Sequence, residues 1–191
     1  MVVVSGSNAQ HVAEQLAQSL GWSHVKLEAR RFPDSEGYIR IPEDEIEAIR
    51  SEPVVVVSNT FPDAGIVETM LILKAVSDVR KGSMENLRGI EPQKMEDIGP
   101  GVYLAVPYFG YSRQDKRFKL GEVISARAIA DMLAGQCDGL AVLDLHAPKV
   151  LENLSVPVAF TSAMPELASH LQSEVNPDFI LSPDKGAIDR A

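Results

Sequence analysis

The sequence predicts an α/β fold with a mostly parallel sheet, and three observations lead to that prediction. Short apolar runs alternate with longer segments whose apolar residues recur at helical spacing. The short runs are continuously apolar, as expected of parallel strands that helices cover on both faces. The sequence contains no tandem repeat with a period of about 20–50 residues, which argues against a solenoid.

Composition agrees with a globular protein and limits its partners. The 191 residues are 45% hydrophobic and 24% charged, and no apolar run approaches the ~18 residues that a membrane span needs. The net charge of −9 disfavours a nucleic-acid partner. A single cysteine, Cys137, excludes an intramolecular disulfide, and the N-terminus lacks the basic and apolar regions of a secretory signal. We therefore expect a cytoplasmic protein that binds neither nucleic acid nor a membrane.

The first third of the chain predicts three strands and one helix. A short apolar run ends in the turn residues SGSN, and the helix that follows at 9–20 stops at Gly21. Residues 43–52 are acidic and predict a short surface helix or loop. The predicted strands are 2–4, 25–27 and 38–41, the last of them preceded by a turn at 32–35.

The middle of the chain carries the strongest signals. Four consecutive valines at 54–57 predict a strand buried on both faces. The glycines, prolines and charges of 81–101 predict a solvent-exposed insertion. The other predicted elements are helices at 66–80 and 124–134, strands at 102–106 and 140–143, and a polar loop at 108–123.

The last part of the chain predicts a unit that is not complete. A strand at 156–160, a helix at 164–174 and a strand at 179–181 precede a polar turn and the start of a helix. Residues beyond about 150 hold too little apolar material for a core of their own. We expect one domain at 1–150 and the beginning of a second at 151–191, so that the chain is the front part of a larger protein or a fragment.

Polar clusters follow five of the predicted strands. Ligands of parallel sheets bind at the carboxyl ends of the strands. Five clusters on one edge therefore predict a site for a polar ligand. The clusters are SGSN (5–8), SNT (58–60), YFGYSRQD (108–115), DLHA (144–147) and SPDKG (182–186).

Two of these clusters hold the residues best suited to chemistry. Arg113 begins a basic run, RQDKRFK, in an otherwise acidic chain, and arginine forks match phosphate oxygens; a solvated face is the alternative. Asp144 and His146 would share one face if their strand continued, and that pair suits a divalent metal or a proton transfer. A capping Asp and a hydrogen-bonded His are the alternative. The sequence has no GxxxxGKS/T, GxGxxG, HExxH or GxSxG motif, so any nucleotide is held in another way.

Four segments, in this order, resemble ribose-phosphate pyrophosphokinase, the phosphoribosyl pyrophosphate synthetase family. They are RRFPDSEGYIRI, VPYFGYSRQDKRFKLGEVISARAIADML, LDLHA and SPDKGAIDRA. The resemblance spans the chain and is broken only at 81–101, which is longer than the family's usual connection. It implies a phosphoribosyltransferase-like parallel-sheet domain, followed by an incomplete second domain of the same type.

The resemblance also implies a reaction and partners. The family transfers the diphosphoryl group of MgATP to the 1-hydroxyl of ribose 5-phosphate, giving phosphoribosyl pyrophosphate and AMP. ATP and ribose 5-phosphate are then the substrates and Mg²⁺ the cofactor. A homo-oligomer, a dimer or larger, is implied because the adenine loop is lent by a neighbouring subunit.

Site residues follow from matching the motifs one by one. Arg113, on the ATP phosphates, and His146, near the γ-phosphate, would be catalytic. Asp184 would contact the ribose hydroxyls or their Mg²⁺. The implied nucleotide-binding residues are Phe32, Asp34 and Glu36 at the adenine, then Arg113, Gln114, Asp115 and Lys116; the implied metal ligands are His146, Asp144 and Asp184.

The chain also departs from the family pattern. The ribose-5-phosphate loop and the basic catalytic loop should lie beyond residue 191, so we expect the chain alone to be inactive. Ser155 and Ala159 stand where many relatives carry acidic residues, and Lys185-Gly186 where many have Gly-Gly. The alternatives are a non-catalytic regulatory relative, which the presence of Arg113, His146 and Asp184 disfavours, and a plain phosphoribosyltransferase, which does not need the basic run.

Overall fold

The computed structural model describes residues 1–81 and 99–182. The chain divides into two compact units, Met1–Phe160 and Thr161–Ala191. The predicted domain boundary at 150/151 falls inside the first unit, and the assignment of the following residues to a second phosphoribosyltransferase-like domain stays a prediction. Most of the predicted insertion at 81–101, and the predicted site residue Asp184, lie outside the described residues.

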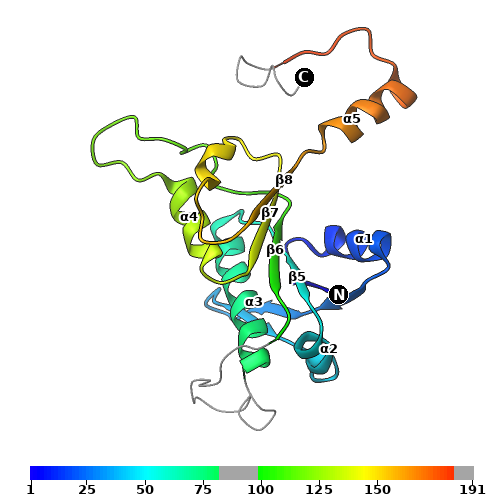
Figure 1. The fold of residues 1–191 in the computed structure, drawn as a ribbon, viewed down its shortest axis with the longest axis vertical. Helices are drawn as coiled ribbons and strands as arrows, with labels where there is room; N and C mark the ends of the chain where they lie inside the picture. The colour runs from blue at the N-terminus through cyan, green and yellow to red at the C-terminus, as the bar shows by residue number, and fades with distance from the viewer. Residues whose placement is uncertain (82–98, 183–191) are drawn as a thin grey trace. The chain divides into compact units, whose positions relative to one another are not determined.

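A six-stranded sheet organises the first unit (Figure 1). The registers of β1 with β2 and β5, of β5 with β6, and of β6 with β7 are all parallel, which confirms the predicted α/β class. In spatial order the strands are β2 (Ser23–Lys26), β1 (Val2–Ser5), β5 (Val54–Val57), β6 (Val102–Val106), β7 (Gly139–Leu143) and β8 (Val158–Thr161).

Helices cover the two faces of this sheet unequally. Alternate residues of a strand point to opposite faces, so Val4 packs in the larger core with the helices of one face, while Val3 packs with Ala17 of α1 on the other. Figure 1 shows α1 on one side of the sheet and α3 and α4 on the other. Tyr103 of β6 is 42% exposed, so the expectation of full cover on both faces holds for β1 but not for β6. The helices are α1 (Gln10–Leu20), α2 (Ile46–Ser51), α3 (Asp63–Lys81) and α4 (Ser125–Ala134).

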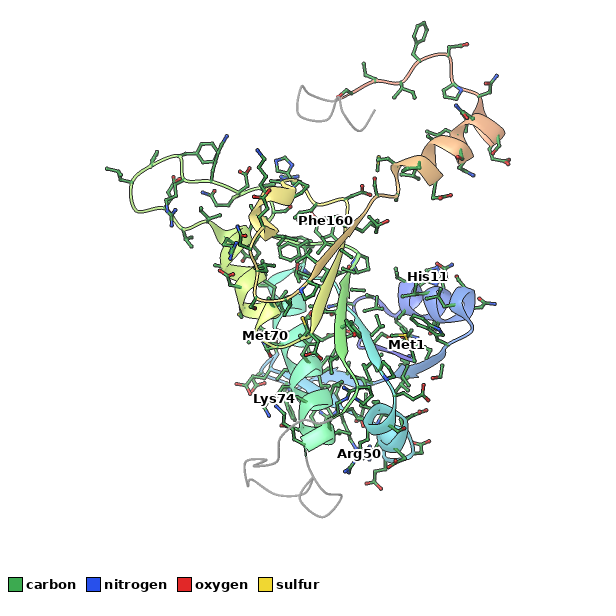
Figure 2. All side chains as sticks on the ribbon, in the orientation of Figure 1. Met1, His11, Arg50, Met70, Lys74 and Phe160 are labelled. Atoms are coloured by element: carbon green, nitrogen blue, oxygen red, sulfur yellow. The ribbon has the colours of Figure 1, made fainter. Side chains whose placement is uncertain are left out.

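The helices begin and end close to their predicted limits. Gly21 adopts a φ of 65° and ends α1, as its position predicted. The charged or polar side chains His11 of α1 and Lys74 of α3 lie on the outer faces of their helices (Figure 2). Residues 43–45 form the 3-10 turn η1 (Glu43–Glu45) ahead of α2. No helix in the described part of the chain is long and apolar enough to cross a membrane.

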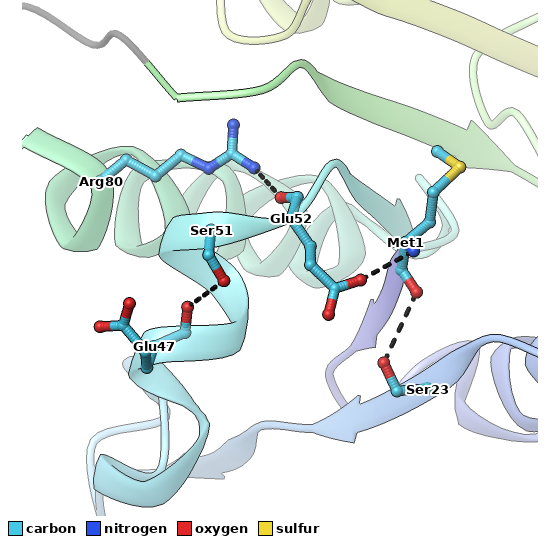
Figure 3. A network of polar contacts seen from close by, with 6 residues as sticks. All are labelled: Met1, Ser23, Glu47, Ser51, Glu52 and Arg80. Atoms are coloured by element: carbon cyan, nitrogen blue, oxygen red, sulfur yellow. Dashed lines mark hydrogen bonds and ion pairs between the residues drawn. The ribbon is translucent and has the colours of Figure 1, made fainter.

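A polar network joins the elements at the amino edge of the sheet (Figure 3). The buried Arg80 of α3 donates from Nε to the carbonyl of Ile49 at 3.1 Å and from Nη2 to the carbonyl of Glu52 at 2.6 Å. These carbonyls lie at the end of α2, so the guanidinium caps that helix. The Glu52 carboxylate pairs with the Met1 amino group at 2.8 Å.

A hairpin that the sequence only half predicted stands beside the main sheet. β3 (Glu28–Arg31) pairs antiparallel with β4 (Gly37–Arg40). The turn expected at 32–35 and the strand expected at 38–41 are present, the strand ending one residue earlier. The strand at 28–31 was missed because its residues, EARR, carry no apolar run.

The second unit confirms one prediction and corrects another. The helix expected at 164–174 is α5 (Met164–His170), which continues as a π-helical turn, η3 (Leu171–Val175). The strand expected at 179–181 is wrong, since none of these residues is in a strand and Phe179 and Leu181 are 91% and 92% exposed. A short apolar run forms a strand only where a neighbour pairs with it.

Candidate functional site

Two asparagines lock the carboxyl ends of β1 and β5 together. Asn8 Oδ1 accepts hydrogen bonds from Ser58 Oγ at 3.2 Å and from the Asn59 amide N–H at 3.0 Å. Asn8 Nδ2 donates to the Asn59 carbonyl at 3.2 Å, and Asn59 Nδ2 donates to the Asn8 carbonyl at 3.0 Å. The remaining oxygen, Asn59 Oδ1, accepts from the Tyr108 amide at 2.9 Å. We call Asn8, Ser58 and Asn59 the amide interlock.

The interlock extends into the neighbouring loops. The Thr60 amide donates to the Tyr108 carbonyl at 3.1 Å, and the Gly110 amide donates to Thr60 Oγ1 at 2.6 Å. A Cβ at Gly110 would lie 2.4 Å from the Thr60 carbonyl oxygen, so the approach requires glycine. Ser7 donates from its amide and its hydroxyl to the Glu68 carboxylate, both at 2.6 Å. The SGSN and SNT clusters, expected to face a ligand, thus direct much of their hydrogen bonding to the protein itself.

The loop between β6 and α4 is tied down at two points. The Tyr111 hydroxyl donates to Asp63 at 2.7 Å, and this hydrogen bond, with burial, raises the pKa of Tyr111 above its ordinary value. The Glu122 carboxylate accepts from the amides of Phe118 at 2.6 Å and Lys119 at 3.0 Å, and Arg117 Nε donates to the Glu122 carbonyl at 2.9 Å. The basic run is therefore closed into a turn by an acidic residue that sequence reasoning did not single out.

The basic run meets the segment after β7 at a hollow of about 590 Å³. One wall comes from the loop and α4, the other from the residues that follow β7. The predicted nucleotide-binding residues Asp115 and Lys116 thus lie beside the end of the DLHA cluster, as the carboxyl-edge argument expects. We call this the cation hollow; its lining residues are Asp115, Lys116, Ile124, Arg127, Ala147, Pro148, Lys149 and Val150.

One cation of the hollow has a structural task. Arg127 Nε meets Asp131 at 2.8 Å, and its Nη1 and Nη2 donate to the carbonyls of Glu152 at 2.6 Å and Asn153 at 3.2 Å. Its guanidinium joins α4 to the turn after η2 (Pro148–Leu151). We therefore do not count Arg127 among the cations that a ligand would meet.

The other two cations of the hollow, Lys116 and Lys149, have no such structural task, and neither has Arg113, which precedes Lys116 in the loop but does not line the hollow. Within residues 1–81 and 99–182, the side chains of Arg113 and Lys149 make no hydrogen bond or ion pair, and Lys116 only stacks over Phe118, with Nζ 5.2 Å from the ring centroid. Gln114 Nε2 donates to the Lys116 carbonyl at 3.1 Å, which shapes the loop. An anion entering the cation hollow would meet two lysines and one carboxylate, so the local net charge is positive and favours binding of an anion.

The end of β7 differs from the sequence-based expectation. The strand stops at Leu143, and Asp144 takes a φ of 46°, a left-handed conformation that Asp tolerates better than most residues. The argument that Asp144 and His146 share a strand face required the strand to continue, so it is wrong. Leu145 between them is buried, Asp144 is half-buried and His146 is exposed.

The predicted adenine residues lie at the hairpin tip. Phe32, Asp34 and Glu36 are exposed, and Asp34 Oδ1 accepts from the Glu36 amide at 3.1 Å. The hairpin borders a separate hollow of about 200 Å³, against α3, which shares no lining residue with the cation hollow. Phe32, Asp34 and Glu36 line neither hollow, so within one chain the residues implied for adenine lie outside the cation hollow.

No preformed metal cluster stands at this edge among the described residues, since no three His, Cys, Asp or Glu side chains gather there or elsewhere in them. Asp144 and His146 are the candidates at the end of β7, and Asp184 falls outside the described part. Mg²⁺ commonly takes one or two carboxylates and completes its shell with phosphate oxygens and water. Asp144 fits that role better than the imidazole nitrogen of His146.

One pair resembles hydrolytic machinery without being suited to it. Ser5 Oγ lies 2.8 Å from His24 Nε2. Ser5 is fully buried at the end of β1, so no substrate can reach its hydroxyl, and a nucleophilic role is excluded. Burial lowers the pKa of His24, as does Lys26, while Glu14 opposes the shift.

Comparison with known proteins assigns the family. The sequence signature described as the N-terminal domain of ribose phosphate pyrophosphokinase matches residues 1–136. The chain belongs to this family. The match to this pyrophosphokinase domain includes the hairpin and the basic run but stops before Asp144 and His146.

Individual relatives agree with this family assignment. The ribose-phosphate pyrophosphokinase of Methanothermobacter thermautotrophicus is 35% identical over 193 residues, and that of Sulfurisphaera tokodaii is 32% identical over 194 residues. In both cases the alignment covers 100% of this chain and 59% of the relative, so the chain spans about 59% of the relatives' length. A crystal structure of phosphoribosylpyrophosphate synthetase from Mycobacterium smegmatis superposes with a TM-score of 0.74 at 22% identity, over 98% of this chain and 58% of that one. That superposition supports the pyrophosphokinase fold.

Sequence reasoning missed two residues of the cation hollow region. Glu122 organises the basic run, and an acid a few residues after a run of cations was the available signal. Lys149 lines the hollow from the opposite wall. No spacing rule pointed to it, because Lys149 comes close to Lys116 only through the packing of the two loops.

Proposed function

We propose that the chain forms the ATP-binding part of an enzyme that transfers the diphosphoryl group of MgATP to ribose 5-phosphate, giving phosphoribosyl pyrophosphate and AMP. Membership of the pyrophosphokinase family supports this proposal. The observation that carries it is the cation hollow, where Lys116 and Lys149 line opposite walls next to the end of β7.

The reaction joins one oxygen to phosphorus and releases another. The 1-hydroxyl oxygen of ribose 5-phosphate attacks the β-phosphorus of ATP, the bond from that phosphorus to the α,β-bridging oxygen breaks, and AMP leaves with the bridging oxygen. The hydroxyl proton is released. Such a transfer depends on positioning and on charge stabilisation rather than on covalent chemistry from the protein.

Each residue then has a role suited to its surroundings. Arg113 and Lys116 would bind the phosphates that accumulate charge in the transition state. His146, which is exposed, would donate a hydrogen bond to a γ-phosphate oxygen. Mg²⁺ supplies charge neutralisation on the phosphates when bound, and Asp144 would hold it.

The remaining implied residues complete the proposal. Phe32, Asp34 and Glu36 would contact the adenine of an ATP held by a second copy of the chain, which makes a homo-oligomer part of the proposal. No residue of the hairpin lines the cation hollow of the same chain, which supports that arrangement. Asp184 would contact the ribose hydroxyls or their Mg²⁺.

Two measurements test the proposal. Calorimetry should detect MgATP binding by the 191-residue chain. Because the chain spans about 59% of its relatives, turnover is tested in a fusion to the C-terminal remainder of the Methanothermobacter relative, with ATP, Mg²⁺ and ribose 5-phosphate. AMP and phosphoribosyl pyrophosphate should appear together. A chain that binds no nucleotide, or a folded fusion that binds ATP without forming AMP, would contradict the diphosphotransferase assignment, and pyrophosphate release that depends on an added base would indicate a phosphoribosyltransferase.

A further inference from the structure

Three side chains of the hairpin form a compact stack. Arg30 of β3 stands directly across from Tyr38 of β4 in the strand register. The Arg30 guanidinium carbon lies 4.0 Å from the Tyr38 ring centroid and 4.9 Å from the Phe32 ring centroid. The two rings meet edge to face, with centroids 5.8 Å apart and an interplanar angle of 86°. Each of the three side chains therefore touches the other two.

The stack limits the motion of the Phe32 ring. Phe32 is 41% exposed, and an exposed ring at a turn would ordinarily sample several rotamers. Cation–π attraction from Arg30 and the edge contact with Tyr38 both favour one placement of the ring. Arg30 is also held by Glu28, 3.6 Å from its Nε.

The backbone of the tip supports the same placement. The Phe32 amide donates to the Glu36 carbonyl at 2.9 Å, and the Ser35 amide donates to the Phe32 carbonyl at 2.9 Å. Arg31 Nη1 closes the turn on the Ser35 carbonyl at 2.7 Å. The ring therefore projects from a backbone that internal hydrogen bonds already fix.

A held, partly exposed ring beside carboxylates suits a particular class of ligand. Planar heteroaromatic bases stack on aromatic side chains, and an exocyclic amine can donate to a carboxylate such as that of Glu36 or Asp34. The tip does not favour a phosphate group, because the carboxylates of Asp34 and Glu36 balance the charges of Arg30 and Arg31, and both guanidinium groups are already engaged within the hairpin. The chemistry of the tip is that of base recognition.

We propose that Arg30 and Tyr38 are positioning residues that hold the Phe32 ring ready to stack on the amino-purine of the nucleotide. This inference rests on the proposed function, since the nucleotide is the one bound there. It adds two residues that act through Phe32. Base recognition is separate from phosphate binding. The inference therefore also predicts that substitutions at Arg30 and Tyr38 leave the affinity for ligands without a base unchanged.

Calorimetry with three ligands tests the proposal on the 191-residue chain. Arg30→Ala should weaken binding of ATP and of AMP about five-fold and leave inorganic tripolyphosphate unchanged. Tyr38→Ala should behave like Arg30→Ala, while Tyr38→Phe should retain wild-type affinity because the ring remains. Arg40→Ala is the matched control: Arg40 stands in the same hairpin, and its guanidinium pairs with Glu28 at 3.2 Å and Glu43 at 3.7 Å.

A second measurement does not depend on nucleotide binding. In NMR spectra of the ligand-free chain, the Phe32 ring resonances should move towards random-coil positions in Arg30→Ala and stay in place in Arg40→Ala. An unmoved ring, wild-type affinity for ATP in Arg30→Ala, or an equal loss for tripolyphosphate would overturn the inference. A wild-type chain that binds no ATP would instead overturn the proposed function, and the NMR comparison would still decide whether Arg30 and Tyr38 hold the ring.

Discussion

Polar residues follow β1 and β5 on one part of the sheet edge and β6 and β7 on the other, but the two parts use them differently. After β1 and β5, Asn8 and Asn59 form paired hydrogen bonds with each other. After β6 and β7, Arg113 and Lys149 make no hydrogen bond or ion pair within the described residues. The difference teaches that two polar clusters at one sheet edge can serve different ends, one joining strands to each other and the other leaving cations for a ligand.

The largest expected effect concerns Arg113, one of the cations after β6 and β7 that make no hydrogen bond or ion pair within the described residues. Arg113→Ala in the active fusion should reduce kcat by on the order of 10²-fold or more, because one transition-state charge contact is worth about 3 kcal/mol. Steady-state kinetics measure the effect. Lys26→Ala, which removes an exposed cation on β2, serves as the control and should leave kcat unchanged. Turnover close to wild type in Arg113→Ala would show that these cations do not serve catalysis.

In the amide interlock after β1 and β5, the expected effect is on the free energy of unfolding. Asn59→Ala removes the donor to the Asn8 carbonyl and the acceptor of the Tyr108 amide. Because the part-buried Asn8 carbonyl would lose its donor and the exposed Tyr108 amide its acceptor, the free energy of unfolding should fall by about 1–2 kcal/mol. Urea denaturation measures this change. The ATP affinity of the folded variant should stay at its wild-type value; a large loss of affinity with unchanged stability would mean that the interlock belongs to the ligand site.

A smaller effect is expected for Lys149, the second cation without a hydrogen bond or ion pair within the described residues. Lys149→Ala should weaken MgATP binding about five- to ten-fold, since a charge-assisted contact to phosphate is lost at an exposed position. Lys149→Arg should retain most of the affinity because the positive charge remains. Calorimetry at two salt concentrations should also show a weaker salt dependence for Lys149→Ala. Equal affinity of Lys149→Ala and wild type would remove Lys149 from the phosphate site.

The sequence predicted the sheet better than the loops, for a physical reason. The valine runs of β1 and β5 report burial directly, so their limits could be predicted closely from the chain alone. The left-handed conformation of Asp144 could not be predicted, because a residue with positive φ at a strand end leaves no apolar pattern in the sequence. The strand expected at 179–181 failed because strand formation needs a partner that three apolar residues do not specify.

The candidate site was predictable only where neighbouring residues carry the chemistry. Arg113 and Lys116 stand in one run, and their excess charge is visible in the sequence. The proposed roles of Lys149 and Arg30 depend on residues of other segments, Lys116 on the opposite wall of the hollow and Tyr38 across a strand pair. Such roles depend on register and loop packing, which the order of residues does not reveal.

The smallest expected effect concerns pH and the interlocked half of the edge. Burial lowers the pKa of His24 below its ordinary value of 6.5, so below about pH 6.5 the unfolded chain binds a proton that the folded chain resists. Stability should therefore fall as the pH drops through this range. Urea denaturation at pH 7.5 and pH 5.0 should show a smaller pH-dependent loss for His24→Gln than for wild type, the difference isolating His24 from the other histidines. Equal losses would mean that the Ser5–His24 contact accommodates the charged imidazole, and that burial of the ring disfavours the charged form little.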